Sequence, residues 1–339
     1  MAQPIDPTYG SDRHGLVWGY RFAPGRPAEA VTSDAVAGIL AAPAAESAGE
    51  FLWLHFSLSN SASEAWLRRH LELPDTFYES LHAEAGSTRL EQDAESLVAV
   101  IHDVLFDFTF DPAAIAITSL CIQPRLLVSA RLKPLRSVDQ LRAAVRLGEL
   151  FRSPVDLLAH LLREQASVLV DILRKSTLRV DGIEDRLLAN RISARQTEIG
   201  ALRRVLVRLQ RLLAPEPAAL FRLLNRPPGW IGHEDLQELR QAAEEFSAAV
   251  GDSVALAERV KLIQEEMSAL LSEQTNRTLF VLTVVTVLAL PINLIAGLFG
   301  MNVGGIPLSD DPYGFALVVV SLLALTGFLG YLALGRRRD

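Results

Sequence analysis

Thr278–Phe299 reads TLFVLTVVTVLALPINLIAGLF, and this stretch of 22 uncharged residues decides the fold of the chain. As an α-helix rising about 1.5 Å per residue it would be about 33 Å long, which is enough to cross the hydrocarbon core of a bilayer. A second uncharged stretch, Tyr313–Leu334, has the same length and lies close to the C-terminus. We predict two transmembrane helices. The alternative, a pair of buried core helices, is disfavoured because the two stretches follow one another at the end of the chain across a short polar loop.

The basic residues next to these stretches predict how the chain crosses the membrane. Arg277 precedes the first stretch and Arg336–Arg338 follow the second, whereas the connecting segment Gly300–Pro312 contains no lysine or arginine. Because positively charged flanks stay in the cytoplasm, we expect both termini there and a multi-pass protein of the cell inner membrane. No signal peptide is recognisable, and the single cysteine, Cys121, is typical of a reducing compartment.

Most charged residues lie before the first predicted span. Of 33 basic and 40 acidic residues, three arginines and three aspartates come after Arg277, so residues 1–277 carry a formal net charge of −7. An acidic surface with interspersed arginines disfavours nucleic-acid binding. No phosphate-binding loop, nucleophile elbow or acid–base pair stands out, so we do not predict an enzyme, although a dispersed catalytic set stays open.

Residues 1–152 alternate between strand and helix patterns, which predicts a cytoplasmic α/β domain. The predicted strands are Gly15–Phe22, Phe51–Leu58, Leu97–Phe106, Ile115–Ile122 and Leu126–Ala130, and the predicted helices lie near Ser33–Leu40 and Ser61–Leu71.

Residues 153–277 change to a helical pattern, opened by Ser153 as N-cap and Pro154 at the first helical position. The predicted helices are Pro154–Asn190, Thr197–Asn225 with an interruption near Pro215, and a third run from near His233 into the bilayer. We divide the chain into the α/β domain (1–152), a helical region with a long stalk helix (153–277), the first span (278–299), an extracytoplasmic loop (300–312), the second span (313–334) and a basic tail (335–339).

Polar or small residues along the first span, with Leu279 and Leu290 in the gaps between them, follow alternating intervals of three and four. This polar stripe consists of Asn276, Leu279, Thr283, Thr286, Leu290, Asn293, Gly297 and Gly300. At about 100° per residue it covers about 120° of the helix surface. Because hydroxyl and carboxamide groups facing lipid cost free energy, the stripe should face protein or water. It fits a helix-packing seam, a pore lining or both, and a pore requires several copies because two spans cannot enclose a water-filled path.

The same spacing continues upstream into the stalk helix. Glu258 and Glu265 fall on the continuation of the polar stripe, whereas Leu256, Val260 and Ile263 lie on a different face. One carboxylate from each copy would form a ring that attracts cations, and an ordinary solvated helix face is the alternative.

The end of the first span and the loop carry a family motif. Ala296–Pro307 reads AGLFGMNVGGIP and resembles the CorA metal-ion transporter superfamily, whose signature Gly-Met-Asn stands at this place before a second span. The continuation Val303–Pro307 looks most like the zinc-transporter (ZntB) branch. Trp53–Phe56, Gly86–Arg89 and Leu126–Arg131 are also similar to ZntB-type cytoplasmic domains.

The resemblance implies a homopentamer with a funnel-shaped cytoplasmic domain, a long stalk helix, a pore-lining first span and a peripheral second span in the lipid. Divalent cations would pass through the central pore, with zinc favoured and magnesium, cobalt or nickel as alternatives, and no cofactor is expected. From another class of protein, the alternative is a two-span membrane sensor or scaffold that does not transport.

The resemblance also implies roles for individual residues. By position, Gly300, Met301 and Asn302 would form the pore entrance, where Asn302 would hold a hydrated cation because small divalent ions dehydrate reluctantly. The other residues of the polar stripe would line the pore, with Leu279 and Leu290 as hydrophobic constrictions. Because Leu290 stands where some relatives have methionine, details of gating are not carried over.

Charged and metal-binding side chains elsewhere give weaker signals. Asp310 and Asp311 in the loop would attract cations or only keep the loop soluble. The seven histidines are dispersed, and no cysteine pair or His-Glu-x-x-His spacing occurs, so the residues of any metal site stay unknown. His102 with Asp103 is either a structural strand histidine or part of a cytoplasmic metal site.

Overall fold

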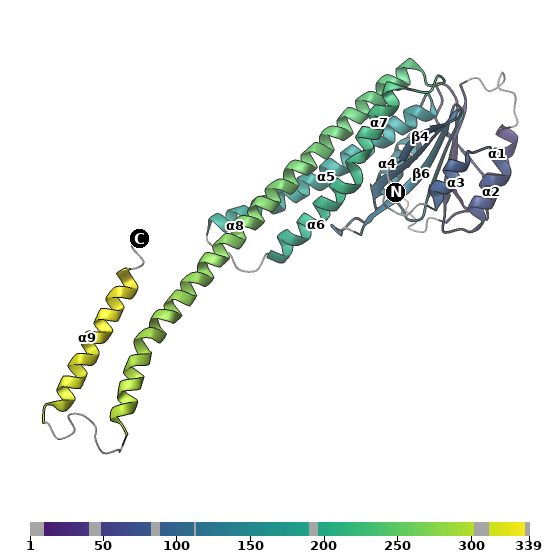
Figure 1. Ribbon diagram of the computed structural model, residues 1–339. Helices are drawn as coiled ribbons and strands as arrows, with labels where there is room; N and C mark the ends of the chain where they lie inside the picture. The colour runs from purple at the N-terminus through teal and green to yellow at the C-terminus, as the bar shows by residue number, and fades with distance from the viewer. Residues whose placement is uncertain are drawn as a thin grey trace, which may run out of the picture. The chain divides into compact units, whose positions relative to one another are not determined.

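The computed structural model describes residues 10–40, 49–82, 89–111, 113–189, 196–301 and 312–335. The chain consists of a first unit, Met1–Gln264, and a second unit, Glu265–Asp339 (Figure 1). One long helix, α8 (His233–Phe299), begins in the first unit and continues into the second.

The first unit is built on a mixed β-sheet. Its strands are β1 (Leu16–Phe22), β2 (Glu29–Val31), β3 (Phe51–Ser57), β4 (Arg89–Asp93), β5 (Ser96–Val104), β6 (Ile115–Gln123) and β7 (Leu126–Arg131). Their order across the sheet is β2-β1-β3-β7-β6-β5-β4, and every neighbouring pair is antiparallel except β3 and β7, which run parallel. The five predicted strands are confirmed, with ends that differ by one or two residues.

The hydropathy pattern misses β2 and β4, which form the two edges of the sheet. The side chains of both strands are mostly exposed, so neither strand presents the apolar alternation that a half-buried strand shows. Each is held by backbone hydrogen bonds to a single neighbour, and such bonds leave no trace in hydropathy.

Helices cover both faces of the sheet, because successive side chains along a strand point to opposite faces. One face is covered by α1 (Ser33–Leu40), α2 (Ala62–His70) and α3 (Asp75–Leu81). There Phe56 of β3 belongs to a buried cluster with Trp66 of α2 and Phe77 of α3. Helix α3 was not predicted, since its seven residues are too few to establish a helical period.

The other face of the sheet is covered by α4 (Arg136–Arg146), α5 (Pro154–Leu188) and α7 (Pro215–Asn225). Trp53 of β3 and Leu120 of β6 point to this face and share a buried cluster with Leu158 of α5. Figure 1 shows the resulting layers, with helices on either side of the sheet. The predicted fold class, an α/β domain followed by a long helix and a second C-terminal helix, is confirmed. Helix α4 was not predicted.

A capping side chain and a proline set two of the helix ends in the first unit. The Ser153 side chain accepts a hydrogen bond of 3.0 Å from the backbone N–H of Asp156, so the predicted cap of α5 is confirmed. Helix α6 (Gln196–Leu213) ends just before Pro215, which opens α7. Within the first unit, Arg259 of α8 forms ion pairs with Asp181 and Glu184 of α5, which tie the two helices together.

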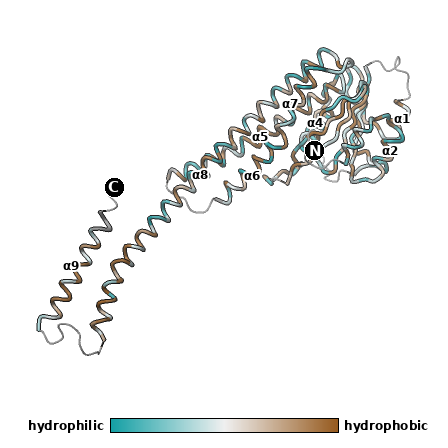
Figure 2. Tube along the Cα trace, in the orientation of Figure 1, coloured by the Kyte–Doolittle hydropathy of each residue, from teal (hydrophilic) through white to brown (hydrophobic). Residues whose placement is uncertain are grey.

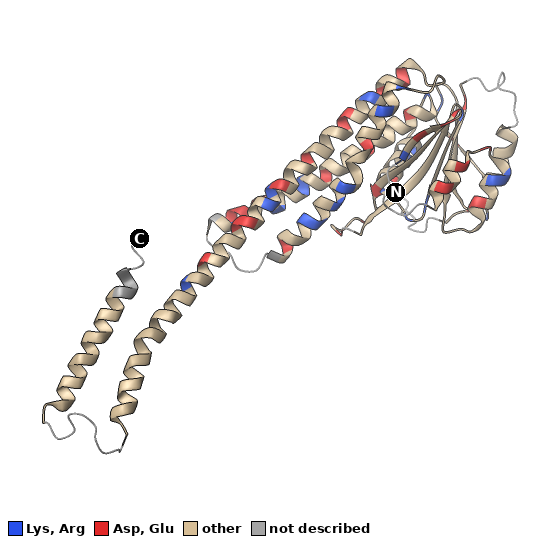
Figure 3. Cartoon of the chain, viewed as in Figure 1, with Lys and Arg blue, Asp and Glu red and all other residues tan. Residues whose placement is uncertain are grey.

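The second unit contains the remainder of α8 and helix α9 (Gly314–Gly335). Both helices have the length and composition expected of membrane spans. Figure 2 shows the hydrophobic colouring of α9 and of the last part of α8, and Figure 3 shows that the Lys, Arg, Asp and Glu positions lie mainly on the first unit. On α8 the last charged residue is Arg277, so the uncharged end of α8 is the predicted first span.

Candidate functional site

All members of the predicted polar stripe lie on α8 or directly after it, and each is exposed within the single chain. They are Asn276, Leu279, Thr283, Thr286, Leu290, Asn293, Gly297 and Gly300. Val281, Leu282 and Val285, on other faces of the helix, are exposed as well. Exposure alone therefore does not single out the stripe, and the distinction lies in its chemistry, because the other faces carry aliphatic groups that suit lipid.

The two threonines of the polar stripe bond to their own helix. The Thr283 hydroxyl donates to the carbonyl of Leu279 and the Thr286 hydroxyl donates to the carbonyl of Leu282, each at 2.8 Å. A hydroxyl that has donated its hydrogen in this way presents only acceptor lone pairs outward. Such oxygens can accept hydrogen bonds from the water molecules around a cation.

Asn276 and Asn293 add carboxamide groups to the stripe. Neither side chain has a hydrogen-bond partner among the described residues. Each brings one oxygen acceptor and two N–H donors, and leaving these groups in hydrocarbon would cost free energy. Asn276 lies just before the first span, whereas Asn293 lies within it, so the Asn293 carboxamide calls for water or a neighbouring chain.

The motif residues begin where α8 ends. The backbone N–H of Gly300 donates to the carbonyl of Ala296 at 2.9 Å. A Cβ at Gly300 would lie only 3.0 Å from the same carbonyl oxygen, so a side chain would strain the last turn. Met301 follows with an exposed side chain. Asn302 lies outside the described residues, as do the loop acids Asp310 and Asp311.

The stalk part of α8 separates its two faces as the sequence predicts. Leu256, Val260 and Ile263 are buried, whereas Glu258 and Glu265 are exposed. The Glu258 carboxylate forms an ion pair of 2.9 Å with the Lys261 ammonium group. This lysine offsets the charge of Glu258, so Glu265 is the better of the two candidates for attracting cations.

No group of three or more His, Cys, Asp or Glu side chains that could hold a metal ion occurs in the described residues. His102 is buried in β5, and its backbone N–H donates to the carboxylate of Glu216 at 2.6 Å. This favours the structural interpretation of His102. The sequence analysis missed Glu216, because the two residues are 114 positions apart and only the packing of α7 brings them together.

A family profile described as "CorA-like Mg2+ transporter protein" matches residues 48–334. The chain belongs to the CorA family. The match extends from the α/β domain through both candidate spans, so it covers the polar stripe and the Gly-Met-Asn motif together. CorA proteins are transporters, and the chain is therefore a CorA-family divalent cation transporter of a membrane rather than a member of an enzyme family.

Known relatives of the CorA family are similar over nearly the whole chain. The divalent cation transporter CmaX of Pseudomonas aeruginosa is 27% identical over 322 residues, which are 94% of this chain and 95% of CmaX. The zinc transport protein ZntB of Pectobacterium atrosepticum is 25% identical over 281 residues, covering 81% of this chain and 84% of ZntB. The solved structure of full-length CmaX superimposes with a TM-score of 0.79 at 26% identity and covers 96% of this chain and 99% of CmaX.

Proposed function

We propose that five copies of this chain assemble around an axis and carry zinc through a central pore lined by the polar stripe of α8. The observation that carries the proposal is the line of outward-facing acceptor oxygens of Thr283 and Thr286 on a membrane span. The described residues of one chain include two candidate spans, which cannot enclose a water-filled path, so the pore needs several copies. The number five rests on the resemblance to CorA transporters.

The proposed path begins at Gly300, Met301 and Asn302. There a ring of Asn302 carboxamide oxygens accepts hydrogen bonds from the water shell of the cation, which stays hydrated. Below the entrance the ion passes Asn293, Thr286, Thr283 and Asn276, with Leu290 and Leu279 as narrow apolar rings. Glu265, and to a smaller extent Glu258, raise the cation concentration at the cytoplasmic end.

The proposed orientation places both termini in the cytoplasm of the cell inner membrane. Arg277 and Arg336–Arg338 support it, since basic flanks stay inside. Asp310 and Asp311 then lie at the outer mouth, where they attract cations from outside the cell.

Zinc is favoured by the similarity to ZntB and by the loop sequence Val303–Pro307. Magnesium, or another divalent ion such as cobalt or nickel, is the second candidate, because the family description names Mg²⁺ and CmaX is a divalent cation transporter. Uptake of labelled zinc into proteoliposomes, with competing unlabelled zinc or magnesium and with or without a pH gradient, tests the choice. We expect unlabelled zinc to compete better than equal magnesium, and the reverse result would contradict zinc specificity.

Replacing Thr286 with valine should slow cation uptake by at least about fivefold, because the lost hydrogen bond to a hydrating water is worth about 1 kcal/mol. Valine keeps the shape of threonine, so packing is preserved. The Thr278→Val variant is the matched control, since its hydroxyl also donates to its own helix, at 3.0 Å to Gln274, but lies off the polar stripe. Equal uptake by the two variants in proteoliposomes would argue against a pore lined by this stripe.

A further inference from the structure

A buried imidazole lies at the centre of the sheet, where the parallel strands β3 and β7 pair. His55 of β3 is 0% exposed, and its hydrogen-bond partners Ser129 and Arg131 of β7 are 1% and 3% exposed. A guanidinium group stays charged in proteins, so the burial of Arg131 requires hydrogen-bond acceptors. None of these residues belongs to the polar stripe, and the proposed transport path does not use them.

The hydrogen bonds of His55 admit a single protonation state. The Arg131 Nε–H donates to Nε2 of His55 at 2.7 Å, and a guanidinium group can only donate. Nε2 is therefore the bare nitrogen, and the ring proton is on Nδ1, which lies 2.7 Å from the Ser129 hydroxyl oxygen. A proton on Nε2 would point at the Arg131 N–H and break this hydrogen bond.

The Ser129 hydroxyl uses all of its hydrogen-bonding capacity in this arrangement. Its oxygen accepts from Nδ1 of His55 at 2.7 Å and from the indole N–H of Trp53 at 2.9 Å. Its own hydrogen points to the carbonyl of Leu54 at 3.4 Å. A hydroxyl has two acceptor lone pairs and one hydrogen, so Ser129 has no hydrogen left to donate to a bare Nδ1. The neutral imidazole with its proton on Nδ1 is thus fixed from both sides.

The surroundings of the imidazole disfavour a positive charge. Its ring stacks on the Trp18 indole of β1, with 4.0 Å between the ring centroids. The Arg142 guanidinium of α4 lies 4.5 Å from the centroid of the same indole. Among the described residues, Arg131 and Arg142 are the charged groups that act on His55, and both are cations. A protonated His55 would face these cations inside the core, shielded from bulk water.

We propose that His55 is an acid-sensitive link between β3, β7 and α4 of the first unit. In its neutral form the imidazole binds the buried Arg131 side chain and packs against the Trp18 ring, which Arg142 of α4 contacts. Protonation removes the acceptor for Arg131 and places a second cation beside it. Acid therefore loosens the centre of the sheet and its contact with α4.

The direction of the pH effect follows from burial. Burial lowers the pKa of His55 well below its ordinary value, and the cations Arg131 and Arg142 act in the same direction. In the unfolded chain a histidine takes up its proton near a pKa of about 6.5. A group with a lowered folded-state pKa contributes stability above the unfolded-state value and loses it as the pH falls toward the folded-state value. The contribution of His55 to stability should therefore decrease from about pH 7.5 to about pH 5.5.

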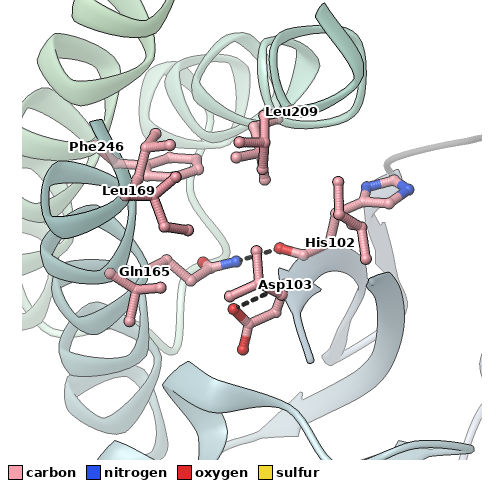
Figure 4. Close-up of a pocket in the computed structure, with 11 residues that line it drawn as sticks. His102, Asp103, Gln165, Leu169, Leu209 and Phe246 are labelled. Carbon is pink, nitrogen blue, oxygen red and sulfur yellow. Dashed lines mark hydrogen bonds between the residues drawn. The ribbon is translucent and has the colours of Figure 1, made fainter. Parts of the chain in front are cut away.

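A second buried ionisable group acts in the opposite direction. Figure 4 shows Asp103 beside Gln165 at the edge of a small cavity, and burial raises the pKa of Asp103 to about 7. A carboxyl group with a raised folded-state pKa contributes stability at low pH and loses it as the pH rises through that value. Asp103 thus opposes the effect of His55, and a comparison of variants separates the two.

Thermal unfolding of the full-length protein in detergent, at about pH 7.5 and about pH 5.5, tests the proposal. The test variant is His55→Gln, whose carboxamide can accept from Arg131 and donate to Ser129 but does not titrate. As the pH falls, the melting temperature of this variant should shift by about 3 °C in its favour relative to the wild type, because the linkage of one proton is lost. His70→Gln is the matched control. His70 is exposed and stacks on Trp66 with 4.6 Å between centroids, and its replacement should leave the wild-type pH dependence unchanged.

Nitrogen NMR of the full-length protein, labelled at its histidines, reads the protonation state and gives a readout that a purely structural role would not change. The wild-type protein should show a histidine signal with the proton on Nδ1 alone at both pH values, and this signal should be missing from His55→Gln. The wild-type spectrum tests the protonation state independently of whether the variant folds. Absence of such a signal, or its conversion to the doubly protonated form by about pH 5.5, would overturn the proposal. An equal pH dependence of melting in the wild type and in His55→Gln would do the same.

Discussion

Cation uptake should fall by at least about tenfold when Asn302 is replaced with alanine, since about 1.4 kcal/mol corresponds to a factor of ten. In the proposed pentamer this substitution removes five carboxamide oxygens at once from the pore entrance. Each hydrogen bond to a charged or strongly polarised partner is worth about 1.5–3 kcal/mol, and a hydrated divalent cation polarises its water shell strongly. The measurement is uptake into proteoliposomes that contain equal amounts of full-length wild-type and variant protein.

The control for this substitution is Asn225→Ala, at the exposed end of α7 in the first unit. It deletes the same carboxamide away from the membrane spans and should leave uptake unchanged. Size analysis in mild detergent shows whether the Asn302→Ala protein still assembles, so a loss of assembly is told apart from a loss of ion binding. Unchanged uptake by an intact Asn302→Ala assembly would contradict the placement of this residue at the pore entrance.

Gly300→Ala tests the structural role of Gly300 in the Gly-Met-Asn motif separately from the proposed ion contact of Asn302. The added Cβ would crowd the Ala296 carbonyl at the end of α8, so this variant is expected to distort the last turn of the helix rather than remove an ion contact. Uptake should fall in both variants, and the melting temperature should fall more for Gly300→Ala.

The sequence is most informative where chemistry is local or periodic. The Ser153 cap and Pro154 predict the start of α5 because a helix terminus is decided by neighbouring residues. The polar stripe follows from the period of a single helix, so its members could be chosen without knowing what surrounds them. Whether the polar stripe faces a pore depends on how several chains assemble, and the sequence of one chain does not determine that.

The sequence is least informative where residues far apart meet. Glu216 contacts His102 only because α7 packs against the edge of the sheet, and neither residue carries a local signal for the other. The edge strands β2 and β4 were missed for a related reason, since their stability lies in backbone pairing rather than in buried side chains. Pairing across the sheet, unlike a helical period, cannot be read from one segment.

Replacing Trp53 with alanine should destabilise the first unit by about 3–5 kcal/mol, the usual cost of emptying a large buried aromatic site. Trp53 is 1% exposed in β3, beside the parallel pairing with β7. Its indole N–H donates to the Ser129 hydroxyl at 2.9 Å, and its ring packs edge-on against Trp18 at 5.7 Å between centroids. The substitution leaves a cavity and removes an aromatic contact and one of the hydrogen bonds of the Ser129 hydroxyl, which His55 also contacts. Thermal unfolding of the full-length protein, followed by circular dichroism, measures the loss of stability.

Two further variants divide this effect into its causes. Ser129→Ala removes the hydroxyl that Trp53 and His55 share and should cost about 1–3 kcal/mol, because the buried indole N–H of Trp53 is left without its acceptor. Leu147→Ala, at a side chain that is 88% exposed, should change stability by less than about 0.5 kcal/mol. If Trp53→Ala costs no more than Ser129→Ala, the hydrogen bond alone accounts for the effect and packing around the indole is not what holds β3 in the core. A larger loss would show that packing around the Trp53 indole stabilises the sheet beyond the hydrogen bond. This packing lies on the face of the sheet opposite α1, α2 and α3.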